Sequence, residues 1–375
     1  MTPKPVTSNA VTVLQTGSRI GILGGGQLGR LLALAAGGLG FDVHIYCPEQ
    51  NCPASRVAAQ TTVAAYDDAD ALAAFAADCD VITYEFENVP AKTVEIISAA
   101  GGRVQPNVKA LEMSQDRVRE KTFLNEIKIP TVEFQAIGGG DDLEEALAKF
   151  GDRGILKTRC EGYDGKGQIK LEGEGTGSKL DEAHALANER PCVLEAFAPF
   201  EREISVVVAR GNSRESTVET LVFDPSENVH EHGILKRSLA PANISGAVQT
   251  AAIDAGVKLA EALDYIGVLA IEFFVMPDGT LLANEFAPRV HNSGHWTPEA
   301  CLTGQFEQHI RAVTGWPLGP VDRIFDIEME NLLGAEVAQI PSGFAAATRL
   351  VSYGKHDPRD GRKMAHTTKR TLRKG

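Results

Sequence analysis

The stretch Val268–Trp296, VLAIEFFVMPDGTLLANEFAPRVHNSGHW, decides how the rest of this chain is interpreted. Two apolar segments flank an Asp-Gly pair, which is typical of a tight β-hairpin turn. If Asp278 and Gly279 form the loop, Glu272 lies directly opposite Glu285. Because like charges in such positions destabilise a hairpin, we expect a cation between them. Mg²⁺ is commonly bound through one or two carboxylates plus substrate phosphates. From the hairpin alone, a solvated surface hairpin without a metal is an equally good interpretation.

Composition narrows the class of protein. A chain of 375 residues predicts two or three domains. Its formal net charge of −13 argues against a nucleic-acid or membrane-surface binder, because a basic footprint is missing. No apolar segment is long enough to span a membrane. Six cysteines without a C-x-x-C pair indicate reduced thiols in a cytoplasmic protein.

The N-terminal region begins as a βαβ unit. A short strand, Arg19–Leu23, leads into GGGQLG at residues 24–29, a helix follows, and Phe41–Tyr46 forms the next strand. The G-x-G-x-x-G spacing, with Glu49 about 20 residues on, suggests a dinucleotide site. The same glycines would also permit close helix–strand packing. In either case the helix N-terminus offers N–H groups to a phosphate or another polar ligand.

Acidic residues follow another strand of this region. Val81–Tyr84 is apolar and runs into Glu85 and Glu87. Ligands bind at the carboxyl ends of strands in open α/β sheets, which favours a functional role. An acidic first turn of the next helix is the alternative, and the sequence leaves both open.

Three further segments could bind anions. The loop GYDGKGQ at residues 162–168 lies between two strands, and such glycine-rich hairpins can close over nucleotide triphosphates. The polar run Ala287–Trp296 is suited to a small oxyanion. Basic residues at 353–355 and 362–364 could form a phosphate pocket. For the loop at 162–168 the alternative is a plain surface hairpin, and for the tail it is an edge that only aids solubility.

We also predict a surface loop at Arg210–Thr220 and one helix over Thr297–Val313.

Taken together, these motifs resemble the ATP-grasp superfamily, and within it the N5-carboxyaminoimidazole ribonucleotide synthetases. The resemblance covers nearly the whole chain from residue 19. It is carried by GILGGGQLGR (21–30), YEFENV (84–89), QDR (115–117), GYDGKGQ (162–168), EAFA (195–198), NEFAPRVHNSGHWT (284–297) and GRKMAH (361–366).

The resemblance implies an α/β protein with the ATP-grasp fold, an N-terminal Rossmann-like (pre-ATP-grasp) domain and a small C-terminal β-rich subdomain. The expected divisions are a loose extension at 1–17, the Rossmann-like domain at 18–112, the lid subdomain at 113–190, the catalytic subdomain at 191–315 and the C-terminal subdomain at 316–375.

The implied reaction is the carboxylation of 5-aminoimidazole ribonucleotide (AIR) through carboxyphosphate, in purine biosynthesis. ATP and bicarbonate are consumed, and ADP and phosphate are released. Glu272 and Glu285 would hold Mg²⁺, or Mn²⁺ in its place. The implied ATP-binding residues are Arg117, Lys157, Gly162, Tyr163, Asp164, Gly165, Lys166, Gly167, Gln168, Glu195, Ala196, Phe197, Ala198, Glu203, His230, Asn284 and Glu285.

The acceptor side is implied by the same resemblance. Arg289, His291, Asn292 and Ser293 would hold bicarbonate or carboxyphosphate, and Tyr163, Asp164 and Lys355 would complete the catalytic set. The AIR-binding residues would be Gln27, Leu28, Glu85, Lys355, Arg362 and Lys363. The glycine loop would then face AIR and not NAD. The family resemblance also implies a homodimer.

Other functions remain as alternatives. A formate-dependent glycinamide ribonucleotide transformylase would share the ATP site and the basic tail, although the HNSGHW run favours the bicarbonate enzyme. An NAD-dependent oxidoreductase would explain the glycine loop alone. A non-catalytic nucleotide-binding regulator is disfavoured by the intact Glu272 and Glu285 pair.

Overall fold

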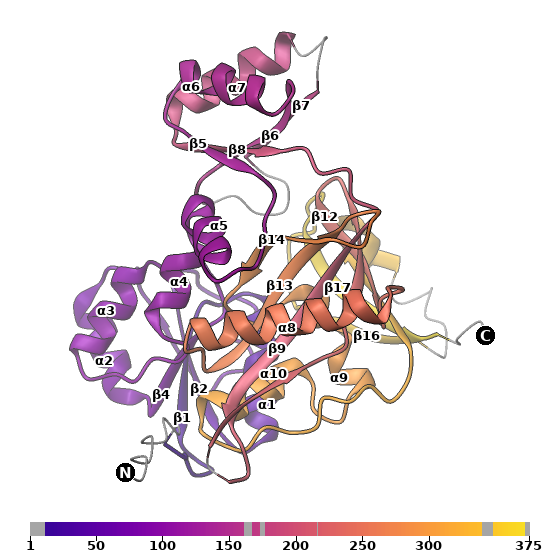
Figure 1. The fold of residues 1–375 in the computed structure, drawn as a ribbon. Helices are drawn as coiled ribbons and strands as arrows, with labels where there is room; N and C mark the ends of the chain where they lie inside the picture. The colour runs from indigo at the N-terminus through magenta and orange to yellow at the C-terminus, as the bar shows by residue number, and fades with distance from the viewer. Residues whose placement is uncertain (1–11, 161–166, 173–176, 216, 340–347, 372–375) are drawn as a thin grey trace, which may run out of the picture.

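The computed structural model describes residues 12–160, 167–172, 177–215, 217–339 and 348–371. Three sheets organise these residues, and Figure 1 shows them as a lower N-terminal unit, a large central sheet and a small unit that projects at the top. No helix in the described ranges is long and apolar enough to cross a bilayer.

The N-terminal unit is a parallel sheet in the order β3-β2-β1-β4, as a Rossmann-like domain requires. Its elements are β1 (Arg19–Leu23), α1 (Gln27–Gly38), β2 (Asp42–Cys47), β3 (Gln60–Val63), α2 (Ala69–Asp78), β4 (Val81–Tyr84) and α3 (Ala91–Ala99). The strand order reverses between β1 and β4. The glycine loop after β1 therefore meets the acidic segment after β4 at one edge of the sheet.

The projecting unit is a four-stranded antiparallel sheet in the order β5-β8-β6-β7, with α6 and α7 on one face (Figure 1). Two helices precede it in the chain and lie between it and the N-terminal unit. The elements are α4 (Val108–Ser114), α5 (Arg117–Glu126), β5 (Phe134–Ile137), α6 (Gly140–Lys149), β6 (Arg153–Thr158), β7 (Gln168–Glu172), α7 (Gly177–Glu189) and β8 (Cys192–Ala196).

The central sheet contains nine strands within the described chain, in the order β14-β13-β9-β11-β12-β15-β17-β16, with β10 paired to β9. Its strands are β9 (Arg202–Asn212), β10 (Val218–Val222), β11 (Ser226–Glu231), β12 (Ile234–Ala240), β13 (Gly267–Val275), β14 (Leu281–Ala287), β15 (Ile327–Leu333), β16 (Thr348–Ser352) and β17 (Lys363–Arg370). The C-terminal strands extend this sheet through the β12–β15 pairing. Its helices are α8 (Gly246–Ala262), η1 (Asn292–Gly294), α9 (Thr297–Ala300), α10 (Gln305–Val313) and η2 (Gly334–Gln339).

The predicted pairing of Glu272 with Glu285 is confirmed, but the loop that produces it was predicted wrongly. Met276 N–H donates to the Thr280 carbonyl at 2.8 Å, which leaves three residues in the loop and not two. Gly279 adopts a φ of +83°, as such loops require. The extra residue is offset by a bulge at Asn284, after which the expected register returns.

Two further segments differ from expectation. The predicted surface loop Arg210–Thr220 is a β-hairpin, because β9 continues to Asn212 and pairs with β10. The predicted single helix Thr297–Val313 is divided into α9 and α10. It breaks before Gly304, where a methyl group would lie only 2.6 Å from Pro298 Cα, so the chain folds back too tightly for a continuous helix.

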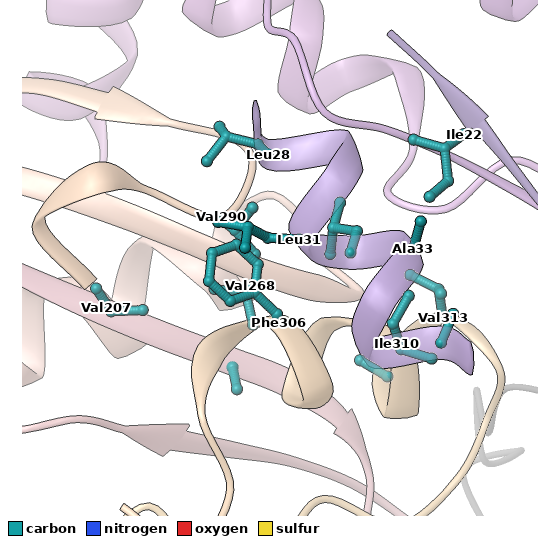
Figure 2. Close-up of a cluster of buried hydrophobic side chains, with 14 of the residues drawn as sticks. Ile22, Leu28, Leu31, Ala33, Val207, Val268, Val290, Phe306, Ile310 and Val313 are labelled. Carbon is teal, nitrogen blue, oxygen red and sulfur yellow. The ribbon is translucent and has the colours of Figure 1, made fainter. Parts of the chain in front are cut away.

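The N-terminal unit is joined to the central sheet by apolar packing and does not lie apart from it. Leu28 and Leu31 of α1 pack in one buried cluster with Phe306 and Ile310 of α10 and with Val268 of β13 (Figure 2). The end of the predicted loose extension is also held, because Leu14 exchanges backbone and indole hydrogen bonds with Thr314 and Trp316. The glycine loop therefore has a fixed position relative to the hairpin.

A buried histidine adds a polar link at the same junction. His309 of α10 accepts a hydrogen bond from Val268 N at Nδ1 (3.1 Å), so its Nε2 carries the proton and donates to Thr83 Oγ1 of β4 (2.8 Å). Burial lowers the pKa of His309 to about 3. The side chain is thus neutral in the folded protein.

This neutral histidine should make stability fall in mild acid. The unfolded chain binds the proton below pH 6.5 while the folded chain does not, so stability is complete above that pH and is lost as pH falls toward 3. When the pH is lowered from 7.5 to 5.5, the free energy of unfolding should fall in both proteins. The fall should be about 1.4 kcal/mol smaller in His309→Gln than in the unchanged protein, as measured by urea unfolding. The exposed His356→Gln should show no such difference. Equal pH dependence in all three proteins would contradict this account.

Candidate active site

The two facing glutamates have different electrostatic surroundings. Arg117, at the start of α5, donates from Nη1 to Glu285 Oε2 at 2.8 Å. Burial opposes ionisation of Glu285, but Arg117 outweighs it and lowers the pKa of this carboxyl. For Glu272, burial and the nearby Glu285 raise the pKa to about 7. Arg117 therefore neutralises the carboxylate of Glu285, whereas Arg117 does not neutralise Glu272.

His291 does not neutralise Glu272, although its Nδ1 lies 3.8 Å from Glu272 Oε1. That nitrogen accepts a hydrogen bond from Ser293 N (3.3 Å) and lies 2.8 Å from Ser293 Oγ. Burial, followed by repulsion from Arg289, holds the pKa of His291 well below its usual value. The imidazole is therefore neutral, and it caps the short helix η1.

The bulged Asn284 contributes another oxygen beside the pair. Its Oδ1 is buried and has no hydrogen-bond partner among the described residues. Two carboxylates and an amide oxygen are the hard donors that Mg²⁺ selects, so these residues fit the metal. No group of three or more His, Cys, Asp or Glu side chains in the described ranges could hold a metal alone. The remaining ligands would have to come from phosphate oxygens or water.

A second charged group lies where α5 meets the projecting unit. Glu195 of β8 is 2.8 Å from Lys157 Nζ and 3.3 Å from Lys121 Nζ. Burial opposes the ionisation of Glu195, but the two lysines lower its pKa to about 2. Lys121 is fully buried and also donates to the Asn284 carbonyl at 2.9 Å. This lysine thus connects the sheet of the projecting unit to the glutamate hairpin.

Polar contacts also fix the neighbouring strands. Glu203 of β9 lies 3.1 Å from His230 Nδ1 of β11. Burial lowers the pKa of His230, but the contact with Glu203 outweighs this and raises it. Ser205, two residues further along β9, donates to Ser293 Oγ at 2.7 Å. The polar run after the hairpin is therefore attached to the centre of the sheet.

Arg289 joins this region to the N-terminal unit. Its Nε and Nη2 donate to the two carboxylate oxygens of Glu87 at 2.5 and 2.6 Å, a bidentate pair that fixes the guanidinium plane. Asn292 exchanges two side-chain hydrogen bonds with Asn331 of β15, at 2.6 and 3.1 Å. Two side chains within the polar run are thereby fixed in orientation.

The glycine loop binds a carboxylate of its own chain. Glu85 accepts hydrogen bonds from Gly26 N (2.8 Å) and Gly29 N (3.0 Å). A methyl group at Gly24 or Gly26 would lie within 2.9 Å of the Glu85 side chain, so the glycines make room for it. The N–H groups that a dinucleotide pyrophosphate would need are therefore occupied.

The basic tail is arranged by its own segment. Lys355 Nζ donates to the Lys363 carbonyl at 2.8 Å, and Arg362 Nη1 donates to the Asp357 carbonyl at 2.9 Å. Lys363 lies close enough to the glutamate pair to influence the pKa of Glu272. The tail thus contributes positive charge that favours the ionised form of Glu272.

Comparison with known proteins agrees with this geometry. Residues 18–115 match the ribonucleotide synthetase preATP-grasp domain, 122–306 the ATP-grasp domain and 328–371 the phosphoribosylaminoimidazole carboxylase C-terminal domain. N5-carboxyaminoimidazole ribonucleotide synthase from Brucella melitensis is 51% identical over 364 residues, which cover 96% of this chain and 98% of that protein. The chain belongs to this synthase family.

Solved structures of the synthase family share the fold. The enzyme from Staphylococcus aureus complexed with ADP superposes with a TM-score of 0.90 at 35% identity, covering 96% of this chain and 95% of that one. The enzyme from Aspergillus clavatus, in complex with ADP and 5-aminoimidazole ribonucleotide, gives a TM-score of 0.86 at 27% identity, with 95% and 94% covered. The predicted ATP-grasp fold with its N-terminal and C-terminal parts is confirmed.

Most of the residues predicted from the synthase resemblance converge, but one group cannot be placed. The hairpin, α5, β8 and the polar run meet as described above. Gly162, Tyr163, Asp164, Gly165 and Lys166 lie outside the described residues. Gly167 and Gln168 lead into β7, where the Gly167 carbonyl accepts from Thr158 N at 3.0 Å. Gln27 and Leu28 begin α1 beside Glu85.

Three residues at this centre were not predicted as site residues: Lys121, Glu87 and Asn331. Lys121 carried a usable signal, because it lies four residues after Arg117 and therefore on the same face of α5. For Glu87 the sequence favours a functional role but does not indicate that Arg289 is its partner. Nothing in the local sequence indicated that Asn331 would meet Asn292, since their contact depends on the pairing of distant strands.

The Glu195 group predicts a double-mutant effect on stability. Glu195→Gln removes the carboxylate that pairs with the buried Lys121 and should lower the free energy of unfolding by about 3 kcal/mol or more. Adding Lys121→Met should restore part of the loss, because the uncompensated charge is removed. Glu95→Gln, in the exposed Lys92–Glu95 pair, should change stability by less than about 1 kcal/mol. Urea unfolding measures all of these, and strictly additive losses would contradict the coupling.

Proposed function

We propose that this protein carboxylates the exocyclic amine of AIR, consuming ATP and bicarbonate and releasing ADP and phosphate. The paired Glu272 and Glu285, with Arg117 beside them, carry the proposal together with the names of the relatives. Phosphoryl transfer depends on positioning and charge neutralisation, and this centre supplies both.

The metal would be held by Glu272 and Glu285, with Asn284 Oδ1 beside them. When bound, Mg²⁺ neutralises the charge that develops on the transferred phosphoryl group. Arg117 neutralises Glu285 in the structure and would share its donors with a phosphate oxygen. Lys157 and the loop at 162–168 would enclose the triphosphate, and Glu195–Ala198, Glu203 and His230 would bind adenine and ribose.

The acceptor chemistry would take place beside the polar run. A bicarbonate oxygen attacks the γ-phosphorus, the bond to the bridging oxygen of ADP breaks, and carboxyphosphate forms. The amine nitrogen of AIR then bonds to the carboxyl carbon, directly or after CO₂ is released, and phosphate leaves. Arg289, fixed by Glu87, and the neutral His291 with Asn292 and Ser293 would hold the anion and exclude water, which would otherwise hydrolyse carboxyphosphate.

AIR would lie between the glycine loop and the tail. Gln27, Leu28 and Glu85 would position the nucleotide, with Tyr163 and Asp164 closing over it. Lys355, Arg362 and Lys363 would bind its phosphate. Because the N–H groups of Gly26 and Gly29 already donate hydrogen bonds to Glu85, the geometry disfavours an NAD-dependent oxidoreductase. We also infer that the protein is cytoplasmic and forms a homodimer. Sedimentation of the purified protein would test the homodimer.

The substrate assignment predicts a selective ATPase. ADP should form with bicarbonate plus AIR, and formate plus glycinamide ribonucleotide should not replace them, because several relatives are named N5-carboxyaminoimidazole ribonucleotide synthases. A coupled assay for ADP with product analysis measures this. Turnover with formate in place of bicarbonate would instead favour the transformylase, and tight NAD binding without ATP hydrolysis would favour an oxidoreductase.

The metal assignment predicts a sharp loss in one variant. Glu285→Ala should abolish ADP formation while the far-ultraviolet circular dichroism stays unchanged, because the residue lies in a partly exposed position on β14. A second measurement, independent of turnover, is Mg²⁺-dependent binding of ATP by calorimetry, which should also be lost. Glu261→Ala, at an exposed position on α8, serves as the control. Near-normal turnover in Glu285→Ala would remove the glutamate pair from the metal site.

A further inference from the structure

Gln305, the first residue of α10, holds the backbone of His291 at both of its polar groups. Its Oε1 accepts a hydrogen bond from His291 N at 2.9 Å, and its Nε2 donates to the His291 carbonyl at 2.7 Å. The same nitrogen lies 3.1 Å from His295 Nδ1, which must accept because an amide nitrogen only donates. Gln305 is fully buried. One side chain therefore holds two residues of the polar run.

The polar run leaves space for this side chain. A methyl group at Gly294 would lie 2.7 Å from Gln305 Oε1, which is too close for non-bonded atoms, so the glycine makes room for the amide. Thr297 Oγ1 accepts from Gln305 N at 2.9 Å and donates to the Gly294 carbonyl at 2.7 Å. The start of α10 is thus attached to the run through its backbone as well as through its side chain.

The imidazole of His291 depends on this backbone contact for its position. Its Nδ1 accepts from Ser293 N at 3.3 Å, so the proton of the neutral ring lies on Nε2. The side chain is only 16% exposed, and Gln305 fixes the backbone that carries it. If the His291 backbone moved, the N–H at Nε2 would move with it. A misplacement of about 1 Å in an active site can cost about 100-fold in rate.

A second glutamine of α10 makes the same pair of contacts with a different residue. Gln308 is also fully buried, its Nε2 donates to the Gly319 carbonyl at 2.6 Å, and its Oε1 accepts from Gly319 N at 3.0 Å. Gly319 lies in the connection between α10 and β15, outside the proposed site residues. The two amides therefore differ in the segment that they hold and not in the way that they hold it.

We propose that Gln305 is a positioning residue for carboxylation: it holds the polar run in the geometry that protects carboxyphosphate from water until the amine of AIR has reacted. The inference rests on the proposed function, since it assumes that the run holds this intermediate. When the run is displaced, water cleaves the bond between the carboxyl oxygen and phosphorus and releases bicarbonate and phosphate. ADP then accumulates without carboxylated product.

The test measures how much ADP forms for each AIR carboxylated. The unchanged protein should form ADP and carboxylated product in equal amounts. Gln305→Met replaces the amide by an unbranched apolar side chain and should raise the ratio of ADP to product at least about 5-fold, because the reacting groups lose their alignment. Gln308→Met is the matched control. Both variants should lower the urea midpoint of unfolding to a similar extent, but Gln308→Met should keep the two amounts equal.

The outcomes separate the two proposals. If the unchanged protein does not carboxylate AIR, the proposed function fails. If it does, but Gln305→Met still forms ADP and product in equal amounts at whatever rate, the positioning role alone is overturned. The same conclusion follows if Gln308→Met raises the ratio as much, because the loss of any buried amide would then explain the effect.

If either Met variant fails to fold, Gln305→Asn and Gln308→Asn are compared in the same assay. Asparagine keeps the amide but is one methylene shorter, so it cannot reach both polar groups of the residue that glutamine holds. The ratio of ADP to product should rise in Gln305→Asn and not in Gln308→Asn. Equal ratios in these two variants overturn the proposal.

Discussion

Two carboxylates held face to face on neighbouring strands create a repulsion that the surrounding protein relieves on one side only. Arg117 forms an ion pair with Glu285, whereas the histidine that lies 3.8 Å from Glu272, His291, is neutral. The folded chain therefore retains a carboxyl group whose ionisation is opposed by burial. A cation placed there would relieve this cost, as the proposed function requires. Without one, the pair opposes the stability of the sheet.

Helix α5 makes this arrangement possible, because its side chains reach both the central sheet and the sheet of the projecting unit. Arg117 and Lys121 lie one turn apart, and they contact the hairpin and β8 respectively. Glu120, between them, accepts from Phe286 N at 2.6 Å, so the helix is also attached to the backbone of β14. In Figure 1 α5 stands between the projecting unit and the central sheet. One short helix therefore links the projecting unit to the glutamate pair.

The sequence was sufficient to predict local elements and the partner of each glutamate, but not all of the geometry that places them. Glu272 was paired correctly because two misjudged features, a three-residue loop and the bulge at Asn284, offset each other. Alternating apolar residues cannot reveal a bulge that leaves the buried face unchanged. The sequence also does not reveal the contact of Asn292 with Asn331, because these residues are 39 positions apart and η1 meets β15 only through the order of strands in the sheet. Motif resemblance supplied the roles that periodicity could not.

The glycine loop shows why a motif needs its spatial context. In a dinucleotide site the glycines let a pyrophosphate approach the helix N-terminus. Here the same spacing admits Glu85, whose carboxylate takes the place that a phosphate would occupy on Gly26 and Gly29. An internal anion makes the loop unsuitable for a second anion while keeping it rigid. The glycine spacing therefore requires only that some anion approaches the backbone closely, and the segment that follows β4 supplies that anion.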